Sequence, residues 1–344
     1  MTALDWGVIA LVALGALSLL WAADPGKAVT DLRVMLIEPG LFYLILRTSI
    51  RDQRGLLRLI DGLLFAGALV AGIGLMLYFG GQGIITAEGG SLRLASVYGS
   101  PNNVGLFLGR CIPFALAYAL ASLDRTRRLF GVGTLILMGI AVLFSQSAGA
   151  LFIGIPAAVL IVSVLTLRRR ARLAVVGLAG VGAAVFAVAM QFPRFARIVD
   201  VGEGTSFFRV RVWQSALQMI ADRPLTGFGL DQFLNAFRGR YMLPDAWQEP
   251  NLSHPHNVLL DFWVRLGIGG VLIFAWIQVA FWRAALRLYR TRPDALTAAL
   301  LIGAMGSMIN LLAHGLVDNS VFVSDLAYVF VLLLGVVGNL HRQD

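Results

Sequence analysis

Long apolar runs recur along the whole chain, and short clusters of polar residues separate them. A helix of about 20 mostly apolar residues crosses the roughly 30 Å hydrocarbon core of a bilayer. The pattern therefore predicts about ten membrane-spanning helices. The second run is the least regular, because Glu38 and Pro39 lie inside it. The predicted spans are residues 6–23, 30–47, 59–80, 103–122, 129–146, 149–167, 172–190, 266–287, 296–315 and 321–340.

The composition excludes a soluble protein. Apolar residues make up 58% of the chain, glycine contributes 38 more positions, and only 14% of residues are charged. Soluble domains have about 25% charged residues and cannot bury so much apolar surface. A soluble enzyme, a disulfide scaffold and a disordered chain are ruled out, and the single cysteine, Cys111, has no internal disulfide partner. The sequence predicts an all-α, polytopic integral membrane protein.

The basic residues lie mainly in alternate loops between the predicted spans. One set of loops holds 16 of them, within residues 47–58, 125–128, 168–172, 283–292 and at Arg342. The short loops of the opposite set hold only Lys27, Arg33 and Arg93. By the positive-inside rule the basic side is cytoplasmic, with both termini inside. The net charge of +9 therefore reflects arginines at the ends of the membrane helices, and we expect no nucleic-acid partner. The first span has no basic region before Asp5, so we do not expect a cleaved signal peptide.

One long polar segment interrupts this regular series. Residues 191–255 form an external loop between predicted spans seven and eight, with seven arginines and six acidic residues. Loops of this length in compact proteins are usually functional or disordered, and the aromatic residues scattered through this one favour order. We therefore expect short amphipathic helices here, and chemistry on the outer face of the membrane. The predicted divisions are spans one to seven (1–190), the external loop (191–257) and spans eight to ten (258–344).

The stretch Ser253-His254-Pro255-His256-Asn257 precedes an apolar run. Proline is favoured at the first position of a helix and a serine upstream can contribute to its cap, so we expect His256 in the first helical turn. The positive end of the helix dipole would keep the imidazole neutral and favour a nearby anion. The alternative is a histidine at the membrane interface that bonds a backbone carbonyl. A metal pair with His254 is disfavoured, because no further His or Cys lies nearby and Pro255 restrains the approach of the two rings.

Residues 205–221 are predicted to form a helix, capped by Thr205 or Ser206. At about 100° per residue, Arg209 and Trp213 share one face, and Arg211 points about 200° away. One rigid helix can aim only one of these arginines into a given site, and we favour Arg209. A planar guanidinium suits a pair of pyrophosphate oxygens. The alternative is an amphipathic interfacial helix with Arg209 stacked on Trp213.

Two other polar stretches flank predicted spans. The loop from Arg93 to Asn102 leads into the fourth span, where Arg110 should face the bundle interior or a wet cavity, unless it only pairs with Glu38 or a backbone carbonyl. The last short outer loop contains Asp318, which is a candidate to orient a histidine or an arginine, or to cap a helix.

Further short motifs follow in order along the chain, namely Ser147-Ala148-Gly149, the run from Pro224 to Gly229, and Gly267 with Gly270. Together with Arg93–Asn102, Arg209, His256-Asn257 and 314–318, this order resembles the O-antigen ligase and polymerase superfamily of bacterial membrane glycosyltransferases. The resemblance covers nearly the whole chain. It implies transfer of a glycan from an undecaprenyl-pyrophosphate carrier, on the outer face of the inner membrane, to lipid A core, a growing glycan or a protein.

The resemblance also implies roles for individual residues. Arg209 would hold the donor pyrophosphate and His256 would act as the base, in an inverting reaction without metal or cofactor. Histidine, with a free pKa of about 6.5, is suited to that role near neutral pH. The substrate-binding candidates are Arg211, Arg93, Asn102, Arg110, Asn257 and Asp318.

The chain departs from the family pattern in two ways. Many members have arginine where this chain has Ala148, so Arg93, Arg110 or Arg211 would have to substitute for it, or activity would be reduced or altered. Members are also usually longer, so an early pair of helices is expected to be missing. The alternatives to a ligase are a repeat-unit polymerase, a protein-glycosylating ligase, an inactive scaffold, and a transporter of the lipid-linked glycan. The transporter is disfavoured because the two halves show no convincing repeat.

Overall fold

The computed structural model describes residues 1–86, 90–121, 123–191, 195 and 204–343. It is 79% helical with a single two-stranded sheet among those residues, which confirms the all-α class. Nine of the described helices are long and apolar enough to cross a membrane, which confirms a polytopic membrane protein. These candidate spans are Ala3–Trp21, Gln53–Phe79, Pro101–Leu120, Arg125–Ser145, Gly149–Leu167, Ala171–Val188, Val258–Arg290, Ala295–His314 and Ser324–Arg342.

The second predicted span, 30–47, is not among the nine. Its residues divide between α2 (Pro25–Asp31), a π-helical turn (Leu32–Ile37) and α3 (Glu38–Ser49). Pro39 has no N–H to donate, and the Glu38 N–H bonds to Arg33 O in a wider turn than an α-helix makes. Glu38 and Pro39, which make this run the least regular in the sequence, thus lie where the π-helical turn ends and α3 begins.

The described residues form two compact units, each assembled from separate stretches of the chain. The first unit comprises residues 1–49, 200–284 and 315–338, and the second comprises 50–199, 285–314 and 339–344. The first unit contains α1 (Ala3–Leu17), α2, α3, α10 (Gly204–Asp222), α11 (Phe233–Ala236) and most of α12 (Val258–Arg290) and α14 (Ser324–Gln343). The second contains α4 (Gln53–Phe79), β1 (Ile84–Thr86), β2 (Leu92–Leu94), α5 (Pro101–Leu120), α6 (Arg125–Ser145), α7 (Ile155–Leu167), α8 (Ala171–Ala189) and α13 (Ala295–His314).

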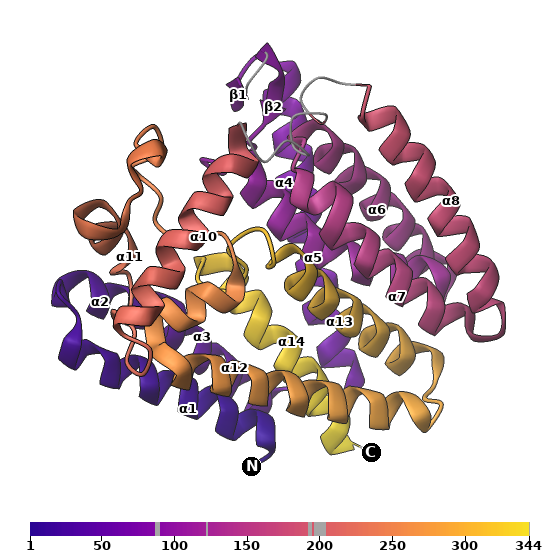
Figure 1. The fold of residues 1–344 in the computed structure, drawn as a ribbon. Coiled ribbons are helices and arrows are strands. Elements are labelled where there is room, and N and C mark those ends of the chain that lie inside the picture. The colour runs from indigo at the N-terminus through magenta and orange to yellow at the C-terminus, as the bar shows by residue number, and fades with distance from the viewer. Residues whose placement is uncertain (87–89, 122, 192–194, 196–203, 344) are drawn as a thin grey trace. The chain divides into compact units, whose positions relative to one another are not determined.

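In the second unit, α5 is the central helix and is buried along most of its length. It packs against α6, α7 and α13 (Figure 1). Close approach depends on small residues, as is usual between helices in membranes. A methyl group at Gly131 of α6 would lie 2.9 Å from the backbone oxygen of Ala115 in α5.

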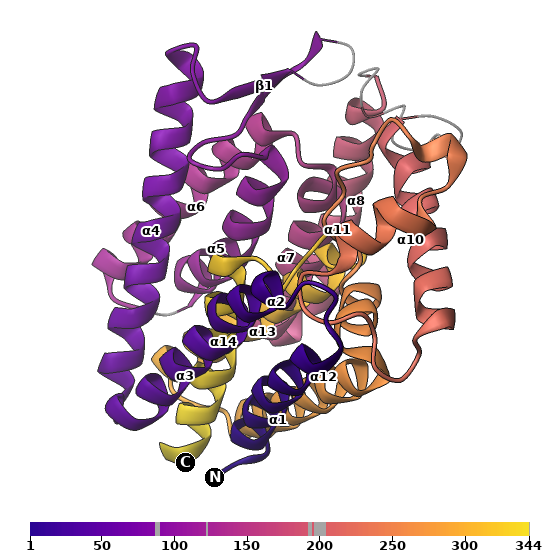
Figure 2. The same ribbon diagram turned by 90° about the vertical axis from the view of Figure 1, so that its left-hand side faces the viewer.

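In the first unit, α1 runs alongside α12 (Figure 2) and is joined to α3 by a buried polar cluster. Asp5 of α1 accepts hydrogen bonds from Arg47 Nε at 3.0 Å and from Tyr43 OH at 2.6 Å. Pairing and hydrogen bonding offset the cost of burying these charges. The cluster therefore fixes the first helix against α3.

The segment between α10 and α12 has its own apolar core, which includes Val264 of α12. Its short elements are α11, a π-helical turn (Phe237–Tyr241) and a 3₁₀ turn (Pro244–Ala246). The buried members are Val212, Ala216, Met219, Ile220, Phe228, Phe233, Phe237, Tyr241 and Val264. The part of the long predicted loop that the structure describes is thus ordered, as its aromatic residues indicate. The start of that loop, including Arg194 and Arg197, lies outside the described residues.

The helix α12 is interrupted at Gly267, whose φ of 63° and ψ of −165° are not helical. The run Pro224–Gly229 bonds to the interrupted backbone. Phe228 N donates to Val264 O at 2.7 Å, Gly229 N to Arg265 O at 3.0 Å, and Ile268 N to Pro224 O at 2.9 Å. Polar backbone groups freed at membrane depth must find partners within the protein, and this run supplies them. The first part of α12 is thereby fixed to the end of α10.

We expect Gly267→Ala to destabilise the first unit strongly. The positive φ costs an L-residue roughly 1–2 kcal/mol, and the added methyl group would overlap the backbone of Leu225 and Thr226, which are part of the bonded run. Thermal unfolding of the purified protein in detergent measures the loss. Gly62→Ala in α4 is the control, because nothing lies within 4 Å of its added methyl group. Equal stability of the two variants would show that the interruption is not held as described.

Candidate active site

The beginning of α12 brings His256 next to Asp318. Val258 N donates to Gly315 O at 2.6 Å, and Asn257 Nδ2 donates to Leu316 O at 3.0 Å. These bonds hold the two segments together, and His256 Nδ1 lies 2.9 Å from Asp318 Oδ1. Asp318 is buried, whereas the side chain of His256 is 20% exposed. With the proton on Nδ1 directed to the carboxylate, Nε2 is the acceptor nitrogen of the ring.

Asn257, and not Ser253, caps α12. Its Oδ1 accepts from Leu259 N at 3.0 Å and from Leu260 N at 3.2 Å, and the helix begins at Val258. The expectation of Pro255 at the first helical position is therefore wrong, since asparagine is at least as good a cap as serine and stands closer to the apolar run. His256 lies just before the helix with a left-handed backbone (φ 49°). Asn257 thus uses both side-chain atoms within the protein.

His254 lies beside His256 and stays neutral. Its Nδ1 accepts a hydrogen bond from His256 N at 3.2 Å, and the two ring centroids are 4.2 Å apart. The surrounding protein displaces water from the ring, and this, followed by the charge of His256, lowers the pKa of His254 to about 3. A neutral His254 does not compete with His256 for the charge of Asp318.

The donor atoms of His254, His256 and Asp318 lie within 4.8 Å of one another, a grouping that could hold a metal ion. The expectation that Pro255 keeps the two rings apart is therefore wrong, because the left-handed turn at His256 folds them together. The hydrogen bonds of the two rings fit proton transfer: one ring nitrogen of His256 bonds the carboxylate, and Nδ1 of His254 accepts from a backbone N–H.

The pKa of His254 predicts a loss of stability in acid. Because the folded pKa is about 3 and the unfolded pKa is 6.5, the unfolded chain binds this proton more readily, so stability falls as the pH falls through 6.5 toward 3. We expect His254→Asn, which keeps an acceptor but cannot titrate, to flatten that part of the curve. Unfolding temperatures of both proteins between pH 7 and pH 4.5 test this. Parallel curves would contradict it.

The two arginines of α10 have different surroundings. Arg211 is bound within the protein, with its NH2 2.6 Å from Asp245 Oδ2 and its guanidinium over the ring of Phe207. Arg209 is half-buried, and its charge is one of those that lower the pKa of His254. Within the described part of the chain, Arg209 forms no ion pair and does not stack on Trp213. Arg209 is therefore the arginine of α10 whose guanidinium is available near the histidines.

A buried charge cluster of Arg265, Asp261 and Asp31 lies in the same unit and was not identified from the sequence. Arg265 Nε lies 2.7 Å from Asp261 Oδ1, and its NH1 lies 2.8 Å from Asp31 Oδ2. The guanidinium also stacks over Phe322 at 4.7 Å. Asp261 and Arg265 are four residues apart in an apolar run, and this spacing indicates that the two side chains pair on one helix face. Nothing in the sequence indicates Asp31, which is 234 residues away from Arg265.

The other predicted residues belong to the second unit. Arg93 on β2 donates to Asn102 Oδ1 at 2.8 Å and to Ser145 O at 2.9 Å, so these two candidates contact each other. Arg110 is fully buried in α5 and donates to Asn310 Oδ1. Glu38, a predicted partner of Arg110, instead belongs to the first unit, where its Oε1 lies 3.5 Å from Arg33 Nε. Ala148 precedes a π-helical turn over Gly149–Gly154.

The fold and these contacts define a polytopic, all-α membrane protein with a histidine–aspartate pair before an interrupted helix. Residues 133–275 match the family model described as O-Antigen ligase. The match supports the predicted resemblance to the O-antigen ligase superfamily, over a segment that contains Arg209 and His256. This family comprises ligase- and polymerase-type membrane glycosyltransferases. No curated protein matches the chain.

Proposed function

We propose that the protein is a membrane glycosyltransferase of the O-antigen ligase type. It moves a glycan from an undecaprenyl-pyrophosphate carrier to a hydroxyl group of an acceptor such as lipid A core. The observation that carries the proposal is the contact of His256 Nδ1 with the buried Asp318, with Arg209 close by. The family match supports the class of reaction.

His256 acts as the general base in this proposal. Asp318 holds the imidazole with Nδ1 protonated and stabilises the imidazolium that forms, as an orienting carboxylate does in other histidine-dependent enzymes. Nε2 takes the proton of the acceptor hydroxyl as its oxygen bonds to the anomeric carbon. The bond from that carbon to the pyrophosphate oxygen breaks, and the configuration at the carbon inverts. The products are the glycosylated acceptor and undecaprenyl pyrophosphate.

Arg209 binds the leaving group in this proposal. Breaking the glycosyl bond leaves negative charge on the pyrophosphate, and a preorganised guanidinium stabilises charge of this kind in a low-dielectric site. No carboxylate of the described residues pairs with Arg209, so its charge is available to a substrate. A role in substrate binding for Arg93, Asn102, Arg110, Arg211, Asn257 and Asp318 stays a prediction from the sequence.

We place the segment 191–257 and the histidine pair on the outer face of the inner membrane, with both termini in the cytoplasm. The arginine distribution supports this orientation. It gives the site access to a carrier lipid in the outer leaflet. The three divisions 1–190, 191–257 and 258–344 then correspond to a membrane bundle, an external module and a closing set of spans.

The test is transfer in reconstituted vesicles, with a labelled undecaprenyl-pyrophosphate glycan and a mixture of candidate acceptors. Label on an acceptor with wild type, lost with His256→Ala, supports the proposal, and the acceptor's identity separates ligase from polymerase. Label that crosses the bilayer on its original carrier would overturn the proposal in favour of a transporter. No transfer and no movement, from a sample that unfolds cooperatively, would favour an inactive scaffold.

We expect transfer to continue at an unchanged rate in excess EDTA. Arginine supplies the positive charge and histidine takes the proton, so the proposed step needs no divalent cation. The measurement compares initial rates with and without EDTA on purified, reconstituted protein. Loss of activity that returns on adding a divalent metal would contradict the mechanism and direct attention to the grouping of His254, His256 and Asp318.

A further inference from the structure

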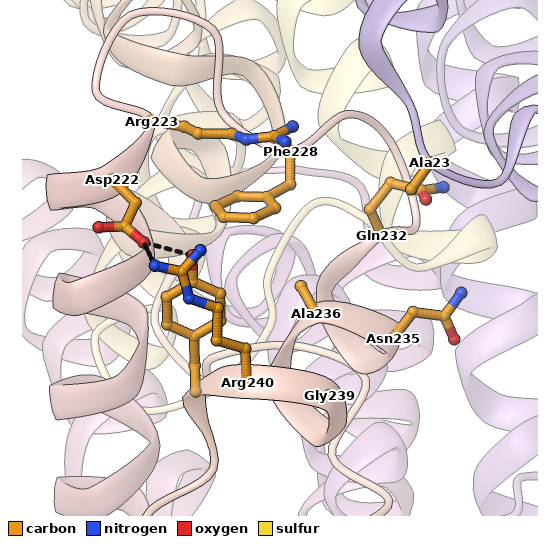
Figure 3. Close-up of a pocket in the computed structure, with 10 residues that line it drawn as sticks. Ala23, Asp222, Arg223, Phe228, Gln232, Asn235, Ala236, Gly239 and Arg240 are labelled. Carbon is orange, nitrogen blue, oxygen red and sulfur yellow. Dashed lines mark hydrogen bonds and ion pairs between the residues drawn. The ribbon is translucent and has the colours of Figure 1, made fainter.

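A pocket of about 530 Å³ lies in the first unit, beside the end of α10. That volume is within the range of small-molecule sites. Figure 3 shows Asp222, Arg223 and Arg240 on one side of it, with Gln232 and Asn235 across from them. Small residues (Ala23, Ala236 and Gly239) line the rest and leave the interior open. None of the residues assigned to the transfer step lines this pocket.

One wall is a fixed polar cluster. Asp222 Oδ2 accepts from Tyr241 OH at 2.6 Å and lies 3.0 Å from Arg240 NH2. Burial and the neighbouring carboxylate raise the pKa of Tyr241, so its hydroxyl stays a donor to Asp222. The side chain of Arg240 is nevertheless 74% exposed, and it lines the pocket.

The same wall carries an excess positive charge. Arg223 lies over the ring of Phe228 at 4.8 Å, which holds the guanidinium at the pocket, and Phe228 packs edge-on against Tyr241. Among the described residues no carboxylate pairs with Arg223. Two arginines and one aspartate thus leave one positive charge on this wall, and an arginine fork of this kind binds carboxylate or phosphate oxygens.

The opposite wall presents amide groups. Gln232 is fixed by two bonds to the backbone of Asp24, from Asp24 N to Oε1 at 2.8 Å and from Nε2 to Asp24 O at 3.0 Å. Asn235 accepts from Lys27 Nζ at 3.3 Å through Oδ1, which leaves its Nδ2 as a donor. The fixed amide, the exposed amide and the arginines are groups that bind hydroxyls as well as anions.

We propose that this pocket binds an acidic sugar unit, one that carries a carboxylate or a phosphate group. The arginine wall takes the anionic group, and Asn235 across the pocket takes ring hydroxyls. An inorganic anion would fill only a small part of 530 Å³ and would leave the amide wall without a partner. A sugar ring with an anionic substituent meets both walls.

The inference rests on the proposed function, because it makes the pocket a secondary site for a glycan substrate outside the transfer step. Direct binding is therefore measured separately from transfer. Saturation-transfer NMR on the protein in nanodiscs would use D-glucuronic acid, D-glucose, glycerol 3-phosphate and inorganic phosphate as probes. Glucuronic acid is expected to bind, glucose to bind more weakly, and the two small phosphates to bind least.

Three variants make the test specific. Arg223→Gln removes the unpaired charge and should weaken glucuronate binding roughly tenfold, as expected for one lost charge-assisted contact. Gly239→Leu should abolish binding, because its side chain fills the opening without changing any charge. The protein should tolerate this side chain, since nothing lies within 4 Å of an added methyl group at Gly239. Arg238→Gln removes a neighbouring exposed arginine that does not line the pocket and should change nothing.

The outcomes separate the pocket from the transfer site. Binding that survives in Gly239→Leu, or that falls equally in Arg238→Gln, would overturn the proposal. Equal binding of glycerol 3-phosphate or phosphate would show a simple anion or lipid-headgroup site and would also overturn it. If transfer is absent but glucuronate binding follows these variants, the proposed function fails and the sugar site stands. In a transfer assay, a higher KM for the donor or for the acceptor in Arg223→Gln identifies which glycan occupies the pocket.

Discussion

Replacing His256 with alanine is expected to reduce glycan transfer by about 10²–10⁴-fold, the usual contribution of a positioned general base. The variant removes the ring nitrogen that we propose takes the acceptor proton, whereas the cap that begins α12 belongs to Asn257 and remains. The change should appear in kcat, together with a lower unfolding temperature, because the buried Asp318 loses its contact with the ring. Single-turnover rates in vesicles, with saturating donor and acceptor, measure it.

Asp318→Asn is the companion variant, because it tests the role of the carboxylate rather than of the ring. An asparagine can turn its amide toward Nδ1 and favour the opposite tautomer, with the proton on Nε2 where the acceptor should be. We expect a large loss of kcat, since the ring then presents a donor where the acceptor hydroxyl needs an acceptor. If Asp318 were merely structural, Asp318→Asn would lower the unfolding temperature and leave kcat unchanged. Wild-type turnover by His256→Ala would remove the basis of the proposed mechanism.

Local patterns in the sequence predicted most of the spans and the helix of α10. Hydropathy over about 20 residues is a local property, and it sufficed for the nine candidate spans among the described residues. The helix predicted at 205–221 is α10, Gly204–Asp222. Its limits, too, depend on residues close to it in the sequence. Where the apolar pattern was interrupted, at Glu38 and Pro39, the structure differs from the prediction.

Contacts between distant segments could not be predicted in the same way. The bond of Asp318 to His256 joins residues 62 positions apart, and the sequence made Asp318 only a candidate to orient some histidine or arginine. Asp31 has no local feature that points to Arg265. Ser253 and Asn257 are both good caps, so the sequence alone did not fix the first residue of α12. In the structure His256 has a left-handed backbone, and the helix begins after Asn257.

The glycines of the predicted motifs acquire a physical reason only in the fold. Gly227 and Gly267 were noted as part of a family pattern, and the structure shows that their backbones meet. A methyl group on Gly227 would lie 2.6 Å from Val264 O. The motif thus secures the interruption of α12, and through it the position of His256 relative to α10.

Arg209→Ala is expected to reduce transfer by about 10²–10³-fold, comparable to the removal of one donor that stabilises charge in a transition state. The guanidinium is half-buried near His254 and has no described carboxylate partner, so its loss removes substrate binding without leaving a buried charge unpaired. The matched control is Arg211→Ala on the same helix. Its main partners are Asp245 and Gln214, so we expect a small loss of stability and a smaller loss of activity.

The comparison decides which face of α10 meets the donor. Initial rates at varied donor concentration should show a higher KM and a lower kcat for Arg209→Ala, because the leaving pyrophosphate is bound in both the ground state and the transition state. Arg209→Lys should recover only part of the rate, since an ammonium group keeps the charge but not the two parallel N–H donors. If Arg211→Ala abolishes transfer while Arg209→Ala preserves it, the opposite face of the helix binds the donor. The ion pair of Arg211 with Asp245 would then have to open when the donor binds.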